Sequence, residues 1–281
     1  MNRIHQIAIS PKFNFNLLFP EGLLSDFISM IWASDGTPPY AQERIIPDGA
    51  CVLIFNFGDT VVSEAQHIQK DFKKTLFTGV FSHFSSINYI PDKHQHKQIG
   101  IIFKPAGSYP FIRKPIIDFK NLAIETDSFD SKQFDEIHER LANETSIERR
   151  LFLLENILLG LLKKNFEDNV ILELITLVKM NPQMNIKDLV NKTGYSQQHL
   201  NRILGKYAGM NAKGFQKIFR LNAAIKAIQT TAFDINLTDI AYRFNYFDQA
   251  HFIHDIKEMT GIVPKEYRSA QQPTSGRVIY L

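Results

Sequence analysis

The chain of 281 residues is 44% hydrophobic and 22% charged, an ordinary globular balance with room for two domains that have their own cores. Cys51 is the only cysteine, which excludes an internal disulfide and fits a reducing compartment. The first twenty residues do not form a signal peptide, and no apolar stretch reaches the ~18 residues of a membrane span. We therefore expect a soluble, cytoplasmic protein without membrane contact.

The net charge of +3 is distributed unevenly along the chain. From Val170 onward there are 14 Lys and Arg residues and 8 Asp and Glu residues, a formal charge of +6 that leaves −3 for the preceding part. A basic C-terminal part behind a mildly acidic N-terminal part is typical of a nucleic-acid-binding module attached to a domain with another role.

The first 121 residues read as β structure. Short runs rich in Ile, Val and Phe are separated by Pro and Gly turns, which favours a sandwich or a barrel. The predicted strands span residues 5–10, 27–32, 51–57, 76–82, 87–90 and 98–103. Aromatic residues in this region could line a small-molecule pocket, although for any one of them a place in the core is the better interpretation. The candidates are Phe55, Phe57, Phe77, Phe81, Phe84, Tyr89 and Phe103.

The pair His94 and His96 raises the alternative of an enzyme, because metal-binding cupins use a His-x-His pair. The pair follows Pro91 and is flanked by Lys93 and Lys97, so a solvated turn is the better interpretation. The sequence contains no nucleophile motif and no phosphate-binding loop. We predict no catalytic residue, no metal and no cofactor.

Two helices are expected after the strands, at residues 131–142 and from a capping box at Thr145-Ser146-Ile147-Glu148 to about Asn165. One stripe of the second helix has heptad spacing, which predicts a homodimer seam. Its residues are Ile147, Leu151, Leu154, Leu158 and Leu161. The alternative is a helix whose two faces are both buried in the core of its own domain.

A short polar break at residues 163–169 suggests a domain boundary. We expect a β-rich sensor and dimerisation domain at residues 1–166, a helical domain at 167–270 that opens with a helix at 170–180, and a tail at 271–281. The end of the tail, residues 278–281, is apolar and suited to docking on a neighbouring surface.

The helical domain contains an internal repeat. An offset of 52 residues aligns His199 with His251 and Gly209 with Gly261. Each copy predicts two helices joined by a tight turn, with Gly194 or Asn245 ending the first helix and Ser196 or Asp248 capping the second. This is the pattern of a helix-turn-helix, in which the second helix enters the DNA major groove. Between the copies, residues 214–230 have the apolar spacing of one long connecting helix.

Polar residues remain on the outer face of each second helix once the apolar positions are removed. Gln and Asn can pair with adenine, Arg with guanine, and Ala or Ile with a thymine methyl, while Lys suits phosphate. The expected DNA-binding residues are Gln197, Gln198, Asn201, Arg202 and Lys206 in the first copy, and Gln249, Ala250, Ile253, His254 and Lys257 in the second.

The repeat resembles the AraC/XylS family of bacterial transcription regulators. The resemblance rests on residues 245–252 (NYFDQAHF), Ile256-Lys257, 261–268 (GIVPKEYR) and 220–224 (RLNAA). The chain departs from the family pattern at Asn245, His254 and Ile256, where Gly, Arg and Phe are usual. Residues 44–51 and 103–107 are similar to a subgroup of this family with an uncharacterised, cupin-like N-terminal domain.

The resemblance implies an α+β protein, with a cupin-like or sandwich domain followed by an all-α domain with two helix-turn-helix units. It implies a sequence-specific transcription regulator rather than an enzyme, with a double-stranded DNA operator as its partner. Further implied partners are a small-molecule effector in the N-terminal domain, RNA polymerase if the protein is an activator, and a second copy in a homodimer. Alternatives are control by a protein partner, or a metal-dependent cupin enzyme with a DNA-binding appendage.

Overall fold

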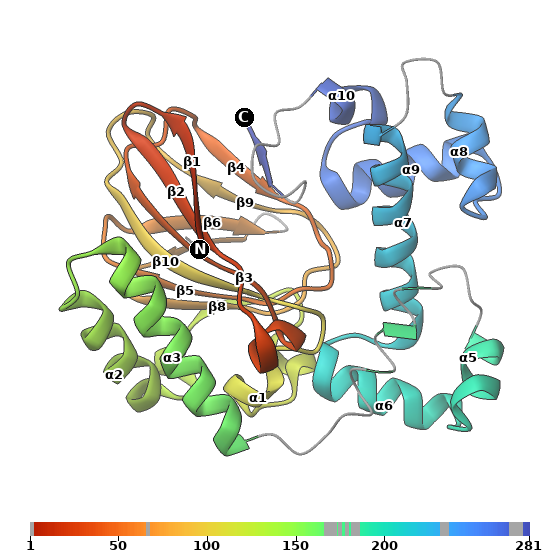
Figure 1. Cartoon of the computed structure of the whole chain (residues 1–281). Coiled ribbons are helices and arrows are strands. Elements are labelled where there is room, and N and C mark those ends of the chain that lie inside the picture. The colour runs from red at the N-terminus through yellow and green to blue at the C-terminus, as the bar shows by residue number, and fades with distance from the viewer. Residues whose placement is uncertain are drawn as a thin grey trace.

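The computed structural model describes residues 3–65, 68–165, 173, 176–177, 180, 186–230, 236–269 and 278–281. Figure 1 shows a β-rich part, residues 3–165, beside a helical part, residues 186–269. The expected α+β fold is confirmed. Most of the helix predicted at residues 170–180 lies outside the described residues. None of the described helices combines the length and the apolar composition that a membrane span requires.

The β-rich part is a sandwich of two antiparallel sheets. The larger sheet has the strand order β1-β2-β3-β10-β5-β8-β11 and the smaller one β12-β4-β9-β6-β7. The strands of the larger sheet are β1 (Ile4–Ser10), β2 (Phe13–Leu18), β3 (Ile28–Gly36), β5 (Val52–Asn56), β8 (Thr75–Thr78), β10 (His96–Phe103) and β11 (Ala123–Glu125). Those of the smaller sheet are β4 (Gln42–Ile45), β6 (Val61–Ala65), β7 (Ile68–Phe72), β9 (Ser85–Asn88) and β12 (Val278–Tyr280).

Strand β5 shows why the larger sheet is the middle layer of the molecule. All five of its residues are buried. Val52 and Ile54 belong to the core between the two sheets, whereas Leu53 and Phe55 belong to the core under the helices. Because successive side chains of a strand point to opposite faces, only a strand covered on both sides has this continuous apolar pattern.

Short helices and two longer ones cover the outer face of the larger sheet. The short ones are η1 (Gly22–Asp26), α1 (Tyr109–Ile112), η2 (Ile116–Phe119) and η3 (Thr126–Ser128), and the longer ones are α2 (Ser131–Ala142) and α3 (Ile147–Asn165). The expected bounds of α2 and α3 are confirmed. The cap of α3 is Ser146 rather than Thr145, because the Ser146 hydroxyl accepts from the Arg149 N–H at 3.4 Å.

The predicted dimer seam on α3 needs correction. Leu151, Leu154 and Leu158 are at most 2% exposed and belong to the core of the chain itself. Ile147 and Leu161 are half-buried and pack against the same core. Helix α3 contacts α1, α2, β3 and η1, so these leucines cannot meet a second copy without opening the domain. The alternative, a helix buried in its own domain, holds for the three leucines.

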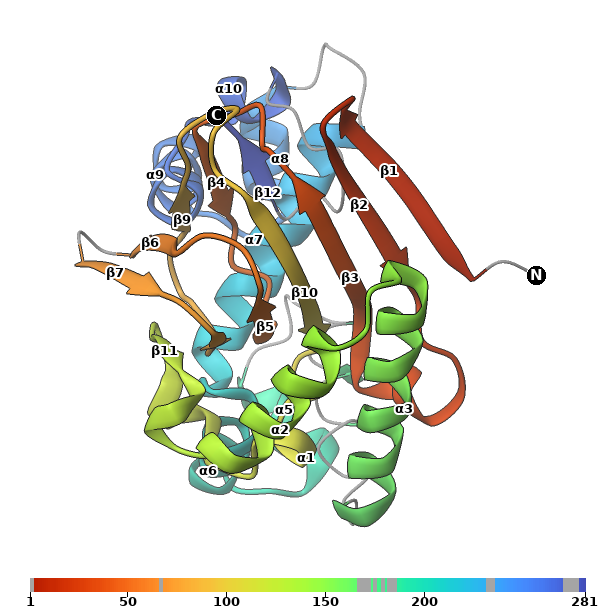
Figure 2. The same ribbon diagram turned by 90° about the vertical axis from the view of Figure 1, so that its left-hand side faces the viewer.

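The helical part consists of α5 (Ile186–Thr193), α6 (Gln197–Ala208), α7 (Ala212–Thr230), α8 (Leu237–Arg243), α9 (Gln249–Thr260) and α10 (Pro264–Ser269). The chain then returns to the β-rich part, where β12 pairs antiparallel with β4, as Figure 2 shows. Ile279 in the middle of β12 is completely buried. The apolar end of the tail does dock on a neighbouring surface, and that surface is the edge of the smaller sheet.

Candidate DNA-binding surface and buried pocket

The helices α5–α6 and α8–α9 form two units, each of two helices joined by a tight turn. In the turns, Gly194 has φ +70° and Asn245 has φ +57°, a left-handed conformation that Gly and Asn adopt most readily. Ser196 caps α6 by accepting from the His199 N–H at 3.2 Å, and Asp248 caps α9 by accepting from the His251 N–H at 2.7 Å. The predicted caps and turns of both units are confirmed.

Helix α7 connects the two units. Its 19 residues span about 28 Å, close to the ~34 Å of one turn of a DNA duplex. Figure 1 shows α6 near one end of α7 and α9 near the other. The apolar residues predicted to hold this helix in place are all buried, namely Phe215, Ile218, Leu221, Ala224, Ile225 and Ile228.

The first unit exposes three of its five expected DNA-binding residues, Gln197, Gln198 and Arg202. Asn201 is half-buried, and its side-chain oxygen accepts from the Ala212 N–H at 3.1 Å, which satisfies a free donor at the start of α7. Lys206 lies 5.3 Å from the ring centroid of Tyr109 in the β-rich part. Asn201 and Lys206 thus have structural contacts that the sequence did not reveal.

In the second unit, Ala250, His254 and Lys257 are exposed, and Ile253 is half-buried. Gln249 is also half-buried, and its side-chain oxygen accepts from the Thr238 hydroxyl at 2.8 Å. That bond joins α9 to α8. The outer face of α9 is therefore less polar than that of α6.

An ion-pair network that the sequence analysis missed fastens α9 to α7. The Asp255 carboxylate is buried, 3.2 Å from the Lys217 ammonium and 3.8 Å from the Arg220 guanidinium. Arg220 also lies over the Tyr246 ring at 4.4 Å. Arg220 is the first residue of the motif at residues 220–224 (RLNAA), and this motif was the signal in the sequence that could have identified it. Its partner Asp255 could not be identified because it lies 35 positions further along the chain.

The helical part rests on the β-rich part along α6, α7 and α9. Gly209 lies so close to Ile116 that an added Cβ would come within 2.9 Å of its side chain. The Asn222 amide donates to the Pro47 carbonyl oxygen at 2.9 Å, and Glu258 lies 3.2 Å from His83. Both recognition helices are thus positioned by contacts outside their own units.

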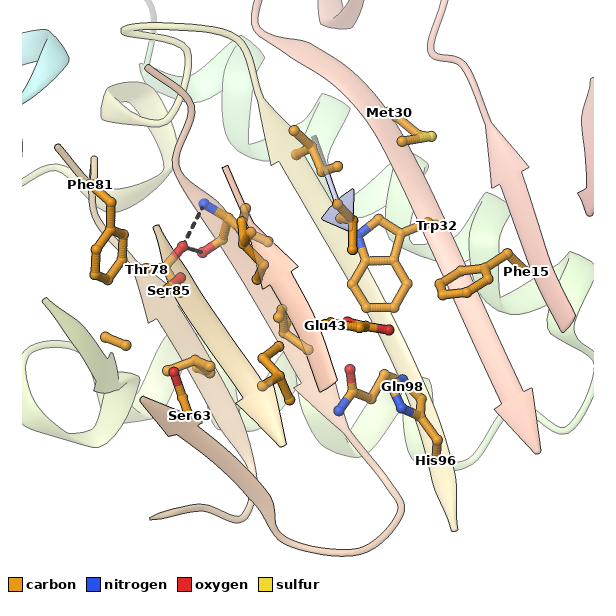
Figure 3. Close-up of a pocket in the computed structure, with 18 of the residues that line it drawn as sticks. Phe15, Met30, Trp32, Glu43, Ser63, Thr78, Phe81, Ser85, His96 and Gln98 are labelled. Carbon is orange, nitrogen blue, oxygen red and sulfur yellow. Dashed lines mark hydrogen bonds between the residues drawn. The ribbon is translucent and has the colours of Figure 1, made fainter. Parts of the chain in front are cut away.

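A cavity of about 100 Å³ lies between the two sheets (Figure 3). Its wall is mainly apolar and aromatic, with Glu43, His96 and Gln98 on one side and the hydroxyl residues Ser63, Thr78 and Ser85 on the other. Twenty residues line it: Phe15, Leu17, Met30, Trp32, Glu43, Ile45, Val52, Ile54, Ser63, Leu76, Thr78, Phe81, Ser85, Ile87, His96, Gln98, Ile102, Ala123, Val278 and Tyr280. Of the aromatic residues predicted to line a pocket, Phe81 does so, while Phe55, Phe77 and Phe103 are fully buried core residues.

Gly100 makes room for the indole of Trp32 in the cavity wall. The two residues are register partners on β10 and β3, and a Cβ on Gly100 would come within 2.4 Å of the indole ring. Any larger residue at position 100 would push Trp32 toward the other sheet. The cavity therefore depends on this glycine.

One side of the cavity wall contains Glu43 and His96. Burial raises the pKa of the Glu43 carboxyl to about 7, although the Tyr40 hydroxyl donates to it at 2.6 Å. Burial also lowers the pKa of His96 to about 3, so its ring is neutral at physiological pH. Neither ring nitrogen of His96 has a hydrogen-bond partner among the described residues. Polar groups with unmet hydrogen-bonding capacity in an otherwise apolar pocket are typical of ligand sites.

The interpretation of the His94 and His96 pair as a solvated turn was wrong for His96. This residue is the first of β10, is 3% exposed and points into the sandwich, because the chain already pairs with β3 at that position. His94 lies in the preceding turn and is half-buried. The described residues contain no group of three or more His, Cys, Asp and Glu side chains that could hold a metal ion.

Each of the two parts of the chain matches a known protein family. Residues 189–270 match the family described as "Helix-turn-helix domain", and residues 17–125 match "Domain of unknown function (DUF6597)". The HTH-type transcriptional activator AarP of Providencia stuartii is 29% identical over 105 residues, 37% of this chain and 76% of the relative. The probable transcription factor PqrA of Proteus vulgaris is also 29% identical over 105 residues, 37% of this chain and 84% of the relative.

Among solved structures, apo ToxT from Vibrio cholerae aligns with 92% of this chain and 98% of its own, at 13% identity and a TM-score of 0.47. An AraC-type regulator from Chromobacterium violaceum aligns with 34% of this chain and 87% of its own, at 23% identity and a TM-score of 0.32. The two helix-turn-helix units, their capped recognition helices and the matched relatives agree. The chain is a transcription regulator of the AraC family, with a β-rich N-terminal region and a double helix-turn-helix.

Proposed function

We propose that this regulator reads a specific DNA operator with α6 and α9 in successive major grooves, under the control of a small molecule bound between its two β-sheets. One observation carries the DNA-reading part. Two capped recognition helices lie at the two ends of one rigid helix, and each exposes polar side chains on its outer face. A separation close to one duplex turn lets both helices reach the same face of the DNA.

The roles of the side chains follow from their exposure. Arg202 and Gln198 are exposed on α6 and can reach base edges, although Arg202 also contacts the His199 ring at 3.4 Å, and Ala250, Ile253 and His254 can reach them from α9. Gln197 and Lys257 lie where phosphate contacts are expected. Asn201, Lys206 and Gln249 contact DNA only if their present partners release them.

Control by a small molecule is supported by the origin of the cavity wall. Val278 and Tyr280 line the cavity, yet they follow the DNA-binding helices in the chain. A ligand that stabilises or displaces docked β12 therefore changes how the helical part is tethered to the sandwich. If the ligand binds the docked and the undocked state with different affinities, it shifts the equilibrium between them. The cavity itself favours this reading over control by a protein partner, which would need no cavity.

The remaining expectations are part of the same proposal. Residues 1–166 act as the sensor and residues 167–270 as the DNA-binding domain, while the end of the tail at 271–281 belongs to the sensor sheet. Homodimerisation would use a surface other than the buried leucines of α3. Contact with RNA polymerase is expected if the protein activates transcription.

Selection of bound sequences from a random duplex pool at two salt concentrations tests the DNA-reading part. We expect a motif of two blocks about ten base pairs apart that is enriched at both concentrations. Binding without a motif, lost at the higher concentration, would show that the helical part only holds the phosphate backbone.

A further inference from the structure

The cavity between the sheets contains a buried carboxylate that is not paired with a cation among the described residues. Glu43 is 8% exposed, the Tyr40 hydroxyl donates to it at 2.6 Å, and the Tyr89 hydroxyl is a second neutral donor beside it. No Lys, Arg or His among the described residues lies within ion-pair distance of it. The next residue, Arg44, lies over the Phe84 ring at 4.8 Å, on the opposite face of β4. A buried carboxylate of this kind favours a positively charged partner.

Aromatic rings surround the carboxylate, as Figure 3 shows for Phe15 and Trp32. The Phe15 and Trp32 ring centroids are 5.9 Å apart, and Tyr280 lies 4.5 Å from Tyr40. Aromatic faces attract cations through their quadrupoles, and Trp attracts them most strongly. The carboxylate and the rings thus both favour a positively charged ligand.

His96 adds a hydrogen-bond acceptor to this side of the cavity. Its ring is neutral, neither of its nitrogens has a hydrogen-bond partner among the described residues, and it lies 5.5 Å from the Tyr89 ring. An alkylammonium ion carries three N–H donors and no acceptor. Glu43 and His96 both line the cavity and offer acceptors for such a group in one small region.

The rest of the wall sets the size and shape of the non-polar part. Leu17, Ile45, Ile54 and Ile87 are among the aliphatic residues there, and they leave about 100 Å³. A short, branched aliphatic chain fits such a space.

We propose that the effector is a small aliphatic amine, bound as an ammonium ion between Glu43 and the rings of Trp32, Phe15 and Tyr280. This inference rests on the proposed function of the cavity as the effector site. A carboxylate ligand is disfavoured, because a second anion beside Glu43 repels it.

Three molecules of nearly the same size but different head-group charge distinguish the possible ligand classes. They are 3-methylbutylamine, 3-methylbutanol and 3-methylbutanoate. Trp32 is the only tryptophan in the chain and lines the cavity, so its fluorescence reports binding directly. With the full-length protein at pH 8, we expect the amine to bind at least about tenfold more tightly than the alcohol. The carboxylate should bind more weakly than either.

The Glu43→Gln variant should reduce the affinity for the amine at least about tenfold and leave that for the alcohol unchanged. It should fold, because the amide keeps an acceptor for Tyr40 and removes a buried charge. Glu64→Gln is the matched control, since Glu64 lies on β6 of the same sheet but does not line the cavity. We expect this control to bind all three molecules like the wild type.

Equal binding of amine and alcohol, tighter binding of the carboxylate, no binding of the amine, or an unaffected Glu43→Gln variant would each overturn the inference. The DNA selection described above separates this failure from that of the proposed function. A two-block motif without amine binding would leave the regulator intact and exclude this ligand class. Amine binding without a motif would confirm the ligand class and contradict the DNA-reading assignment.

Discussion

Tyr280 packs against Tyr40 with ring centroids 4.5 Å apart and ring planes tilted by 53°, although 240 positions separate the two residues in the chain. The contact exists because β12 extends the smaller sheet beside β4, with Leu281 accepting from the Ala41 and Gln42 N–H groups at 3.1 and 3.0 Å. The segment that follows the DNA-binding helices is therefore part of the cavity wall. Any ligand in the cavity also contacts the tether of those helices.

Ile279→Ala should loosen this tether. Ile279 is fully buried, and truncating a buried isoleucine costs about 2–4 kcal/mol. Because only three residues pair with β4, we expect the strand to detach, and hydrogen exchange at the Ala41 and Gln42 amides, which donate to Leu281, to accelerate. Leu281→Ala is the control, since that side chain is 48% exposed. Unchanged exchange in the Ile279 variant would show that the strand is held by something other than this burial.

Asp255→Asn should destabilise the packing of α9 on α7. The carboxylate is buried between Lys217 and Arg220, so its loss takes a carboxylate partner from both cations, of which Lys217 keeps Glu258 at 3.0 Å. We expect a loss of about 1–3 kcal/mol in the free energy of unfolding, measured in urea. Glu258→Gln removes a more exposed partner of Lys217 and should cost less than about 1 kcal/mol. Equal costs for the two variants would contradict a special role for Asp255.

His96 predicts an acid-dependent loss of stability. Its pKa is lowered by burial to about 3 in the folded chain, so the unfolded chain, with the ordinary value of 6.5, binds the proton more readily. The free energy of unfolding should therefore fall by about 1.4 kcal/mol per pH unit as the pH drops below 6.5, until it levels near pH 3. The contribution is fully present above pH 6.5.

Urea unfolding of the wild type and of His96→Gln between pH 7 and pH 5 measures this contribution. The variant lacks the titrating group, so the wild type should lose stability relative to it as the pH falls. His5→Gln, at an exposed position on β1, should follow the wild type. Parallel pH profiles for the wild type and His96→Gln would exclude a neutral, buried ring.

Arg202→Ala tests base reading by α6. Arg202 is exposed on the outer face of the helix, and a bidentate contact with guanine is worth about 1–3 kcal/mol of discrimination. We expect the variant to lose affinity for the selected operator and to tolerate any base at one position. If its affinity falls equally for every sequence, Arg202 contacts phosphate instead.

Lys257→Ala tests a phosphate contact at α9. Lys257 is exposed in the last turn of the helix. Its loss should weaken binding to all sequences alike and reduce the slope of log affinity against log salt by about one. A change in base preference would assign it to base reading.

Local patterns predicted the helical part well because its signals are close in sequence. Caps such as Ser196 and Asp248 act within three residues, and the left-handed turn residues Gly194 and Asn245 can be recognised individually. In the β-rich part, the alternation of Phe and Asn from Phe13 to Asn16 was a readable strand signal that the sequence analysis missed. Strand β4, with three polar residues of four, carries almost no such signal.

Long-range pairings could not be predicted from single-sequence patterns. Nothing in the apolar end of the tail indicates β4 as its partner, because strand pairing depends on which sheet edge is open. Glu43 was not predicted as a pocket residue, since one acidic residue in a polar run gives no sign of burial. The heptad stripe on α3 was ambiguous because a dimer seam and a core-facing stripe share the same spacing.

Hydroxyl-radical footprinting of the full-length protein on its selected operator tests the central claim most directly. Two recognition helices at the ends of α7 predict two protected segments, centred about ten base pairs apart on one face of the duplex. Arg202→Ala should weaken one segment and leave the other in place. A single protected segment, or uniform protection along the duplex, would contradict DNA reading by both helix-turn-helix units.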